Sequence, residues 1–210
     1  MVAAVRAQFA GDIVVVDDGS EDDSAQRARG AGALVLRHAC NLGIGAAVQT
    51  CFLYALGHGY DAVVRLDGDG QHDPSFLPQF LHALEAGQAD VVVGSRFLAR
   101  EGYQSTVVRR LGILILGVLS ALVGARVTDP TSGYWALNRR AFAVLARSQP
   151  DDYPETQALV LVTRAGCRIR ELAVIMQARS AGRSSIGALH SGFYMVKVIL
   201  AVLVERLRRR

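Results

Sequence analysis

Short apolar runs recur along the first half of the chain, and each of them ends in polar residues. They cover residues 13–16, 33–37, 62–66 and 90–93, are rich in β-branched side chains and show no polar alternation. Runs of this kind are typical of strands that are buried on both faces of a parallel sheet. The segments between them favour helices. The pattern therefore predicts an α/β fold, a doubly wound and mostly parallel sheet with helices on both faces.

A different pattern begins after residue 96. Residues 111–125 are uncharged and are flanked by arginines, which predicts an apolar helix near 106–125. The uncharged stretch is too short to cross a bilayer comfortably. Its small and its bulky residues lie on different sides of a helical wheel. The segment therefore fits either a buried helix packed closely along its small side or a helix lying in a membrane interface.

The end of the chain predicts a basic amphipathic helix over residues 186–210. No helix breaker follows Gly192, and four of the last five residues are arginines. Such a helix favours the headgroup region of a membrane, where arginines reach lipid phosphates. Lys and Arg number 23 and Asp and Glu number 19, so the net charge is +4, and the excess is concentrated in this tail. This distribution favours an anionic membrane surface over nucleic acid.

Composition narrows the class of protein further. The chain has 210 residues, of which 51% are hydrophobic, and this excludes a disordered protein. Its three cysteines have no CxxC spacing, so they indicate neither a disulfide framework nor a zinc site, and they suit a reducing compartment. We therefore expect one domain over residues 1–185 followed by the basic helix. We expect the protein in the cytoplasm, attached peripherally to the inner face of the membrane.

Polar side chains gather at the ends of three predicted strands. They are Asp17 with Asp18, Asp67 with Asp69, and Ser95 with Arg96. In open α/β sheets the ligand lies beyond the carboxyl ends of the strands. One such strand end is explained by turn chemistry alone. Three of them at one edge of the sheet predict a binding site.

The sequence from Asp67 to Gln71 reads Asp-Gly-Asp-Gly-Gln, and we call it the DXD loop. Its two carboxylates and one amide supply hard oxygen ligands, which suit Mg²⁺ or Mn²⁺ and the phosphate oxygens that these ions also bind. An EF-hand is excluded, because the twelfth position counted from Asp67 is Pro78 and not Glu. The residues alone leave two alternatives, a metal–diphosphate site and a polar loop.

Four segments in order, 14–20, 41–43, 67–74 and 94–96, resemble the family 2 glycosyltransferases. More narrowly, they resemble the dolichyl- or polyprenyl-phosphate sugar synthases, whose later motifs are similar to residues 129–134 and 179–185. The resemblance covers nearly the whole chain. It implies a GT-A fold, a nucleoside-diphosphate sugar as donor and inversion at the anomeric carbon.

The resemblance also implies roles for individual residues. The nucleotide would lie against Asp17, Asp18, Asn41 and Gly43. The metal ion, Mg²⁺ or Mn²⁺, would be held by Asp67, Asp69 and Gln71, and the diphosphate would bind through it. We expect Asp69, Arg96 and Asp129 to be the catalytic residues. His72 fits a hydrogen-bonding role within the loop better than a metal ligand.

The acceptor decides what else the site needs. A sugar hydroxyl needs a carboxylate base, for which Asp129 and Glu155 are candidates, although each also fits a structural role at a helix end. A lipid phosphate is already ionised and needs cations instead. The cations expected are Arg96, Arg110 (or its neighbour Arg109) and Arg179, with Ser184 beside them; the motif here ends Ser184-Ser185 where that branch often has Ser-Lys.

The expected function is therefore transfer of a hexose from a nucleotide sugar to a polyprenyl phosphate at a membrane surface. A glycan or protein hydroxyl acceptor is the alternative, and a homo-oligomer is left open. The family's fold begins with an apolar strand followed by a helix. This chain starts, at Met1, in what resembles that helix, so we expect the first strand to be missing. Its absence would leave two interior strand edges without partners. This favours a further alternative, an inactive nucleotide-binding homologue.

Overall fold

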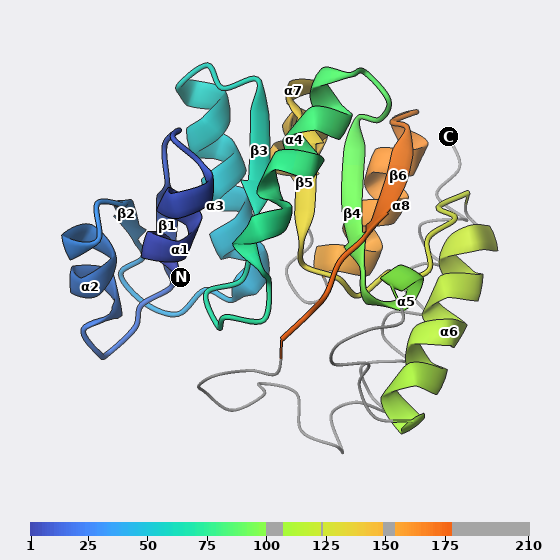
Figure 1. Cartoon of the computed structure of the whole chain (residues 1–210), viewed down its shortest axis with the longest axis horizontal. Coiled ribbons are helices and arrows are strands. Elements are labelled where there is room, and N and C mark those ends of the chain that lie inside the picture. Colours follow the sequence, from blue (N-terminus) through green and yellow to red (C-terminus); the bar gives the residue numbers. More distant parts are fainter. Residues whose placement is uncertain (100–106, 123, 149–153, 178–210) are drawn as a thin grey trace.

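The computed structural model describes residues 1–99, 107–122, 124–148 and 154–177 (Figure 1). The strands are β1 (Val14–Asp17), β2 (Leu34–Arg37), β3 (Ala62–Arg65), β4 (Val91–Ser95), β5 (Trp135–Asn138) and β6 (Ile169–Ala173). The helices are α1 (Val2–Gln8), α2 (Ser24–Gly30), α3 (Ile44–Gly57), the 3₁₀ turn η1 (Pro74–Phe76), α4 (Leu77–Glu85), α5 (Arg96–Ala99), α6 (Val107–Leu122), α7 (Arg139–Ser148) and α8 (Pro154–Arg164). The four apolar runs predicted as strands all form strands.

The main sheet has four strands in the order β3-β5-β4-β6. Strand β4 is parallel to β6, and β5 is antiparallel to both of its neighbours, β3 and β4. Strands β3, β4 and β6 therefore run in one direction and β5 runs against them. The sequence analysis did not predict β5, because its four residues follow directly on a polar motif and carry no β-branched side chain.

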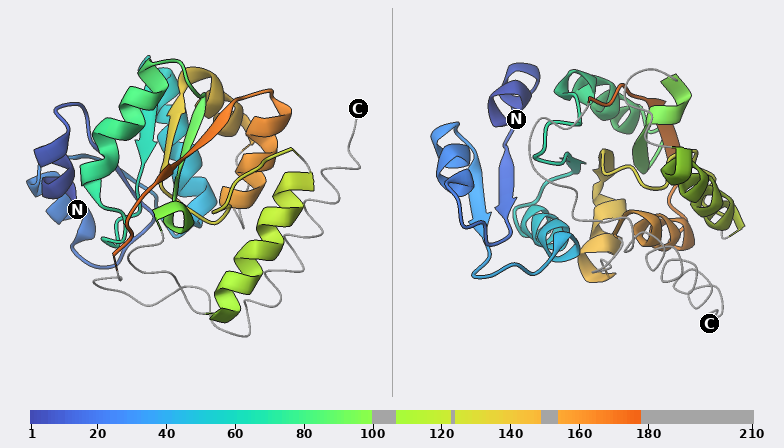
Figure 2. Two further views of the ribbon diagram at one scale, coloured as in Figure 1. Left: turned by 45° about the vertical axis from the view of Figure 1, so that its right-hand side comes forward. Right: turned by 90° about the horizontal axis from the view of Figure 1, so that it is seen from below.

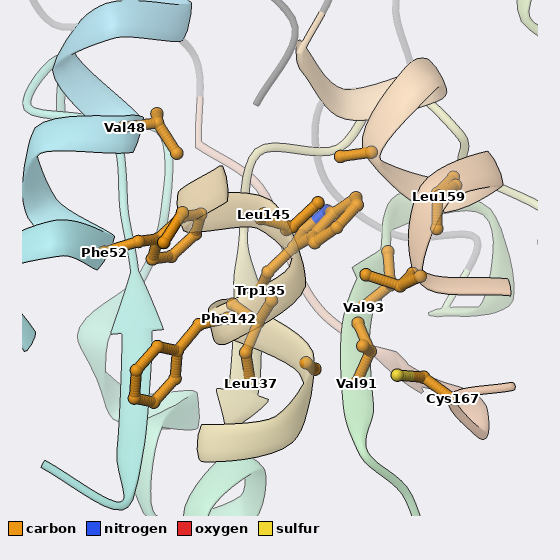
Figure 3. Packing of buried hydrophobic residues seen from close by; sticks show 14 of the residues in the cluster. Val48, Phe52, Val91, Val93, Trp135, Leu137, Phe142, Leu145, Leu159 and Cys167 are labelled. Carbon is orange, nitrogen blue, oxygen red and sulfur yellow. The ribbon is translucent and has the colours of Figure 1, made fainter. Parts of the chain in front are cut away.

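Helices cover both faces of the main sheet, as predicted. Val91 and Val93 of β4 face the same way as Trp135 of β5, into a core shared with α3, α7 and α8 (Figure 3). Val92 and Tyr134 face the opposite way and pack against α4 and α1. Side chains of β4 are thus buried on both faces of the sheet, which explains why its sequence has no polar alternation.

Strands β1 and β2 form a separate parallel pair, set apart from the main sheet (Figures 1 and 2). Within the described residues, β1 pairs only with β2 and β3 pairs only with β5, so one edge of β1 and one edge of β3 have no strand beside them. The valines of β1 and the side chains of β3 are only partly buried, whereas those of β4 are fully buried. The sequence analysis expected two strand edges without partners, and within the described residues β1 and β3 each have one such edge.

Helix α6 lies at the edge of the molecule and packs on α8 (Figure 1). It forms most of the apolar helix predicted near 106–125 and has one buried side, with Ile113 and Leu116, and one exposed side, with Leu114 and Val118. Of the helices in the described ranges, none has the length and hydropathy needed to cross a membrane. The predicted basic helix over 186–210 lies outside the described residues.

Candidate active site

The DXD loop follows β3 directly and is held by hydrogen bonds to its own backbone. Asp69 Oδ1 accepts the backbone N–H of Gln71 at 3.0 Å. Nδ1 of His72 accepts the backbone N–H of Asp67 at 3.0 Å, and its Nε2 lies 4.0 Å from Asp67 Oδ2. His72 therefore acts as a hydrogen-bonding residue within the loop, as the sequence analysis expected.

His72 is buried beneath the loop in a stack of three rings. Its ring centroid lies 5.0 Å from that of Tyr134, which in turn lies 4.4 Å from that of Phe80 on α4. Burial lowers the pKa of His72, so the ring is neutral at pH 7 and keeps Nδ1 as an acceptor. The Tyr134 hydroxyl donates to the carbonyl of Asp73 at 3.1 Å. These contacts fix the loop against the core of the domain.

Arg96 and Asp129 form a buried bidentate ion pair. Arg96 Nε lies 2.7 Å from Asp129 Oδ2, and its Nη2 lies 2.9 Å from Oδ1. Nη2 also donates to Thr131 Oγ1 at 3.0 Å. Asp129 is completely buried and Arg96 is 5% exposed. Asp129 therefore orients the Arg96 guanidinium through both of its carboxylate oxygens.

A carboxylate on β6 holds the loop that carries Asp129. Glu171 accepts the backbone N–H of Thr128 at 2.8 Å and that of Asp129 at 3.0 Å. It also accepts the Thr128 hydroxyl at 2.9 Å, and that hydroxyl lies 2.6 Å from the one of Ser95. Sequence reasoning missed Glu171, because a single acidic residue in a strand gives no signal about a loop 43 residues away.

The second group of predicted residues surrounds the start of α3. Asp18 Oδ1 accepts the backbone N–H of Leu42 at 2.9 Å, and its Oδ2 accepts that of Gly43 at 2.8 Å. His38, which the sequence analysis did not single out, lies with Nδ1 2.7 Å from Asp18 and Nε2 2.9 Å from the hydroxyl of Thr50. Burial acts to raise the pKa of Asp18, but these hydrogen bonds outweigh it and the pKa is lowered.

Two further predicted residues join this group. Asn41 Oδ1 accepts the backbone N–H of Gly43 at 3.1 Å, and Asp17 pairs with Arg37 at 3.1 Å while accepting the N–H of Ser20. The structure thus brings Asp17, Asp18, Asn41 and Gly43 together at the carboxyl ends of β1 and β2. Asp18 positions the loop before α3, a structural contribution in addition to the nucleotide contact that the resemblance implies.

The remaining predicted residues are placed only in part. Arg110 lies in α6, and Arg179 and Ser184 lie outside the described residues. Gln177, the last residue described before them, donates its N–H to the carbonyl of Gln71 at 3.0 Å, and its own carbonyl accepts from the Gln71 amide at 3.5 Å. The chain therefore passes the DXD loop immediately before the segment that holds Arg179.

The DXD loop fits a divalent cation. The carboxylate of Asp67 is 36% exposed, and a Cβ on Gly133 would lie 2.9 Å from its Oδ2, so the glycine leaves room there. No three His, Cys, Asp or Glu side chains of the described ranges gather into a metal-binding group. A divalent cation held by this loop would complete its coordination with diphosphate oxygens and water, as Mg²⁺ does with phosphate substrates.

The chain is similar to several known proteins. The undecaprenyl-phosphate mannosyltransferase of Micrococcus luteus is 31% identical over 95% of this chain and 86% of its own length. The polyprenol monophosphomannose synthase of Mycolicibacterium smegmatis is 30% identical over 89% of this chain and 74% of its own. A crystal structure of glucosyl-3-phosphoglycerate synthase from Mycobacterium tuberculosis, in complex with Mn²⁺, UDP-glucose and phosphoglyceric acid, matches with a TM-score of 0.71 and 21% identity, covering 97% and 74% of the two chains.

The last of these likenesses shows the fold, which is the predicted GT-A arrangement. The family described as "Glycosyl transferase family 2" matches residues 1–145, more than half of the chain. Family match, relatives and fold agree with the motifs read from the sequence, and the chain belongs to glycosyl transferase family 2.

Proposed function

We propose that this glycosyltransferase moves a hexose from a nucleoside-diphosphate sugar to a polyprenyl phosphate at the inner surface of a membrane, with Mg²⁺ or Mn²⁺ as cofactor. The observation that carries the proposal is the DXD loop at the carboxyl end of β3, with the buried Arg96–Asp129 pair at the end of β4. The M. luteus and M. smegmatis relatives support it, since their names specify polyprenyl-type phosphate acceptors and mannose.

The reaction forms one bond and breaks one bond at the anomeric carbon. An oxygen of the lipid phosphate attacks that carbon, and the bond to the nucleoside diphosphate breaks and leaves its electron pair on the diphosphate. A divalent cation, when bound, would neutralise this charge. Asp67, Asp69 and Gln71 would hold the cation, while Asp17 and Asp18 would contact the nucleoside.

The described carboxylates favour a phosphate acceptor over a hydroxyl acceptor. A hydroxyl needs a base, and the two candidates are Asp129 and Glu155. Asp129 is fully buried and paired with Arg96 through both oxygens, and Glu155 pairs with Arg65 at 2.6 Å. Both carboxylates therefore have oxygens that already accept from an arginine, which places them poorly to take a proton from an acceptor hydroxyl. A phosphate needs no base, only positioning by cations.

Helix α6 supports contact with a membrane surface. Leu114, Ile115 and Val118 are 65%, 41% and 56% exposed, and Leu98 of α5 is 46% exposed. Apolar side chains on one side of an amphipathic helix bury themselves at the boundary of headgroups and acyl chains. The three cysteines are unpaired, which agrees with a reducing compartment on the inner side of the membrane.

A transfer assay with two acceptors tests the proposal. The purified chain is incubated with Mn²⁺ and radiolabelled GDP-mannose or UDP-glucose, together with polyprenyl phosphate or with the matching polyprenol. We expect label in the organic phase when polyprenyl phosphate is the acceptor, and none when polyprenol is the acceptor. Label transferred to polyprenol would show a hydroxyl acceptor, and no transfer from either donor would favour the inactive homologue.

A further inference from the structure

One arginine of the chain lies between two carboxylates at the edge of the DXD loop. Arg65 is the last residue of β3, and its side chain is 10% exposed. Its Nη2 lies 2.6 Å from Glu155 Oε1 and 3.6 Å from Asp67 Oδ1. The guanidinium is thus hydrogen-bonded to Glu155 and stands just beyond hydrogen-bond distance from the first carboxylate of the loop.

Glu155 is held in place by the start of α8. It lies in the first turn of that helix, directly after Pro154, where a carboxylate is favourable. The next residue, Thr156, is buried and donates its hydroxyl to the carbonyl of Pro130 at 3.2 Å, which ties the helix to the loop after Asp129. The Glu155 carboxylate therefore reaches Arg65 from an element that is packed against the rest of the site.

The charges around the loop are balanced only while this pair is intact. The Arg65 guanidinium is charged at neutral pH, as arginines are in proteins, and it faces the carboxylates of both Glu155 and Asp67. The charges of Arg65 and Glu155 cancel, which leaves the charge of Asp67 to meet a divalent cation. If Glu155 loses its charge, Asp67 is the carboxylate that remains within 4 Å of Arg65 in the described ranges.

Arg65 would need only a small movement to form a hydrogen-bonded ion pair with Asp67. Its Nη2 lies 3.6 Å from Asp67 Oδ1, and an ion-pair hydrogen bond of about 2.9 Å is reached by a shift of about 0.7 Å. A carboxylate that accepts an arginine in this way presents less charge to a metal ion. Gly133 does not block the movement, since it carries no side chain beside either group.

We propose that Glu155 is a positioning residue that holds Arg65 away from Asp67, so that this carboxylate stays available to a divalent cation. The inference rests on the proposed function, because it presupposes a metal ion at the DXD loop. It assigns to the start of α8 a part in metal binding without any contact with the metal.

Two variants test the inference. Glu155→Gln removes the charge and keeps the size, while Arg65→Gln/Glu155→Gln also removes the competing cation. Mn²⁺ is titrated into each protein alone, with GDP and with UDP, and the signal of unbound Mn²⁺ is followed by electron paramagnetic resonance. We expect Glu155→Gln to weaken Mn²⁺ affinity by about tenfold or more, as substitutions of residues around metal ligands do. The double variant should return to within about threefold of the unaltered protein.

Each result decides something different. If the unaltered chain binds no Mn²⁺ in any of the three conditions, the metal of the proposed function fails and the inference falls with it. If it binds Mn²⁺ and Glu155→Gln binds equally well, the inference alone is wrong. If the double variant binds Mn²⁺ as weakly as Glu155→Gln does, the pair has a structural role only and the inference is wrong. If Glu155→Gln fails to fold, the double variant decides the question. A Mn²⁺ affinity of the double variant more than tenfold below that of the unaltered protein overturns the inference. Glu21→Gln, at an exposed carboxylate, is the matched control.

Discussion

The ion pair between Arg96 and Asp129 is the most deeply buried charged contact of the site and allows a quantitative prediction. Asp129 accepts the Arg96 side chain at 2.7 and 2.9 Å and its backbone N–H at 3.3 Å. Asp129→Ala removes both acceptor oxygens, and with them all three hydrogen bonds, and leaves the guanidinium without this carboxylate at a residue that is only 5% exposed. A buried charge without its partner is costly, because water cannot replace the lost interaction.

Breaking one side of a buried pair typically costs about 3–5 kcal/mol of unfolding free energy. For a protein of this size, 1 kcal/mol corresponds to a shift of about 2–4 °C in the melting temperature, so we expect a decrease of roughly 6–20 °C. Asp129→Asn keeps the shape and one acceptor, and should cost less. Transfer activity should fall in both variants, because Arg96 loses its orientation.

Urea unfolding followed by circular dichroism measures this cost. The control is Arg27→Ala, which removes an ion pair of 2.8 Å whose side chains are 78% and 54% exposed. Exposed pairs are screened by water, so this variant should change the unfolding free energy by less than about 1 kcal/mol. If Asp129→Ala loses no more stability than Arg27→Ala, the pair does not organise the site and the reasoning is refuted.

Three further predictions follow from single features of the structure. In Gly133→Ala the new Cβ would lie 2.9 Å from a carboxylate oxygen of the DXD loop, so transfer should fall about tenfold, whereas Gly30→Ala, with open space around it, should leave transfer unchanged. Burial acts to raise the pKa of Asp90, but hydrogen bonds outweigh it and lower the pKa from 3.8. The ionised carboxylate therefore stabilises the folded state at pH 7, and this stabilisation is lost as the pH falls through the folded-state pKa. Asp90→Asn should therefore be less stable than the unaltered chain in urea at pH 7, with a smaller difference at pH 3, and an equal difference would contradict the assignment. Leu114→Asn/Val118→Asn should reduce co-sedimentation with anionic vesicles without changing the melting temperature, and undiminished binding would exclude α6 as the contact.

The strands of this fold could be predicted because burial on both faces leaves a local record. Runs such as residues 91–93 are apolar throughout, and their side chains enter two different cores. Strand β5 left no such record, since its four residues, Trp135–Asn138, carry no β-branched side chain and follow directly on a polar motif. Its antiparallel placement between β3 and β4 depends on tertiary pairing that no local pattern encodes.

The site could be predicted as far as its chemistry lies at strand ends. Asp67 and Asp69 could be singled out because they follow an apolar run, and Asp17 and Asp18 because they stand at the end of another. His38, Glu171 and the Arg65–Glu155 pair were not found as partners, because each acts on a segment distant in sequence. Arg65 contacts a residue 90 positions away, and this choice of partner is made by the packing of α8 on the sheet.

The central claim is that the DXD loop holds the cation and diphosphate during transfer, and Asp69→Asn tests it most directly. The measurement is the initial rate of label transfer to polyprenyl phosphate at saturating Mn²⁺, with Asp61→Asn as the control because it removes an exposed carboxylate just before β3. We expect Asp69→Asn to lose at least about a hundredfold in rate with an unchanged melting temperature, and Asp61→Asn to keep full activity. A folded Asp69→Asn protein that transfers sugar at the unaltered rate would contradict the account.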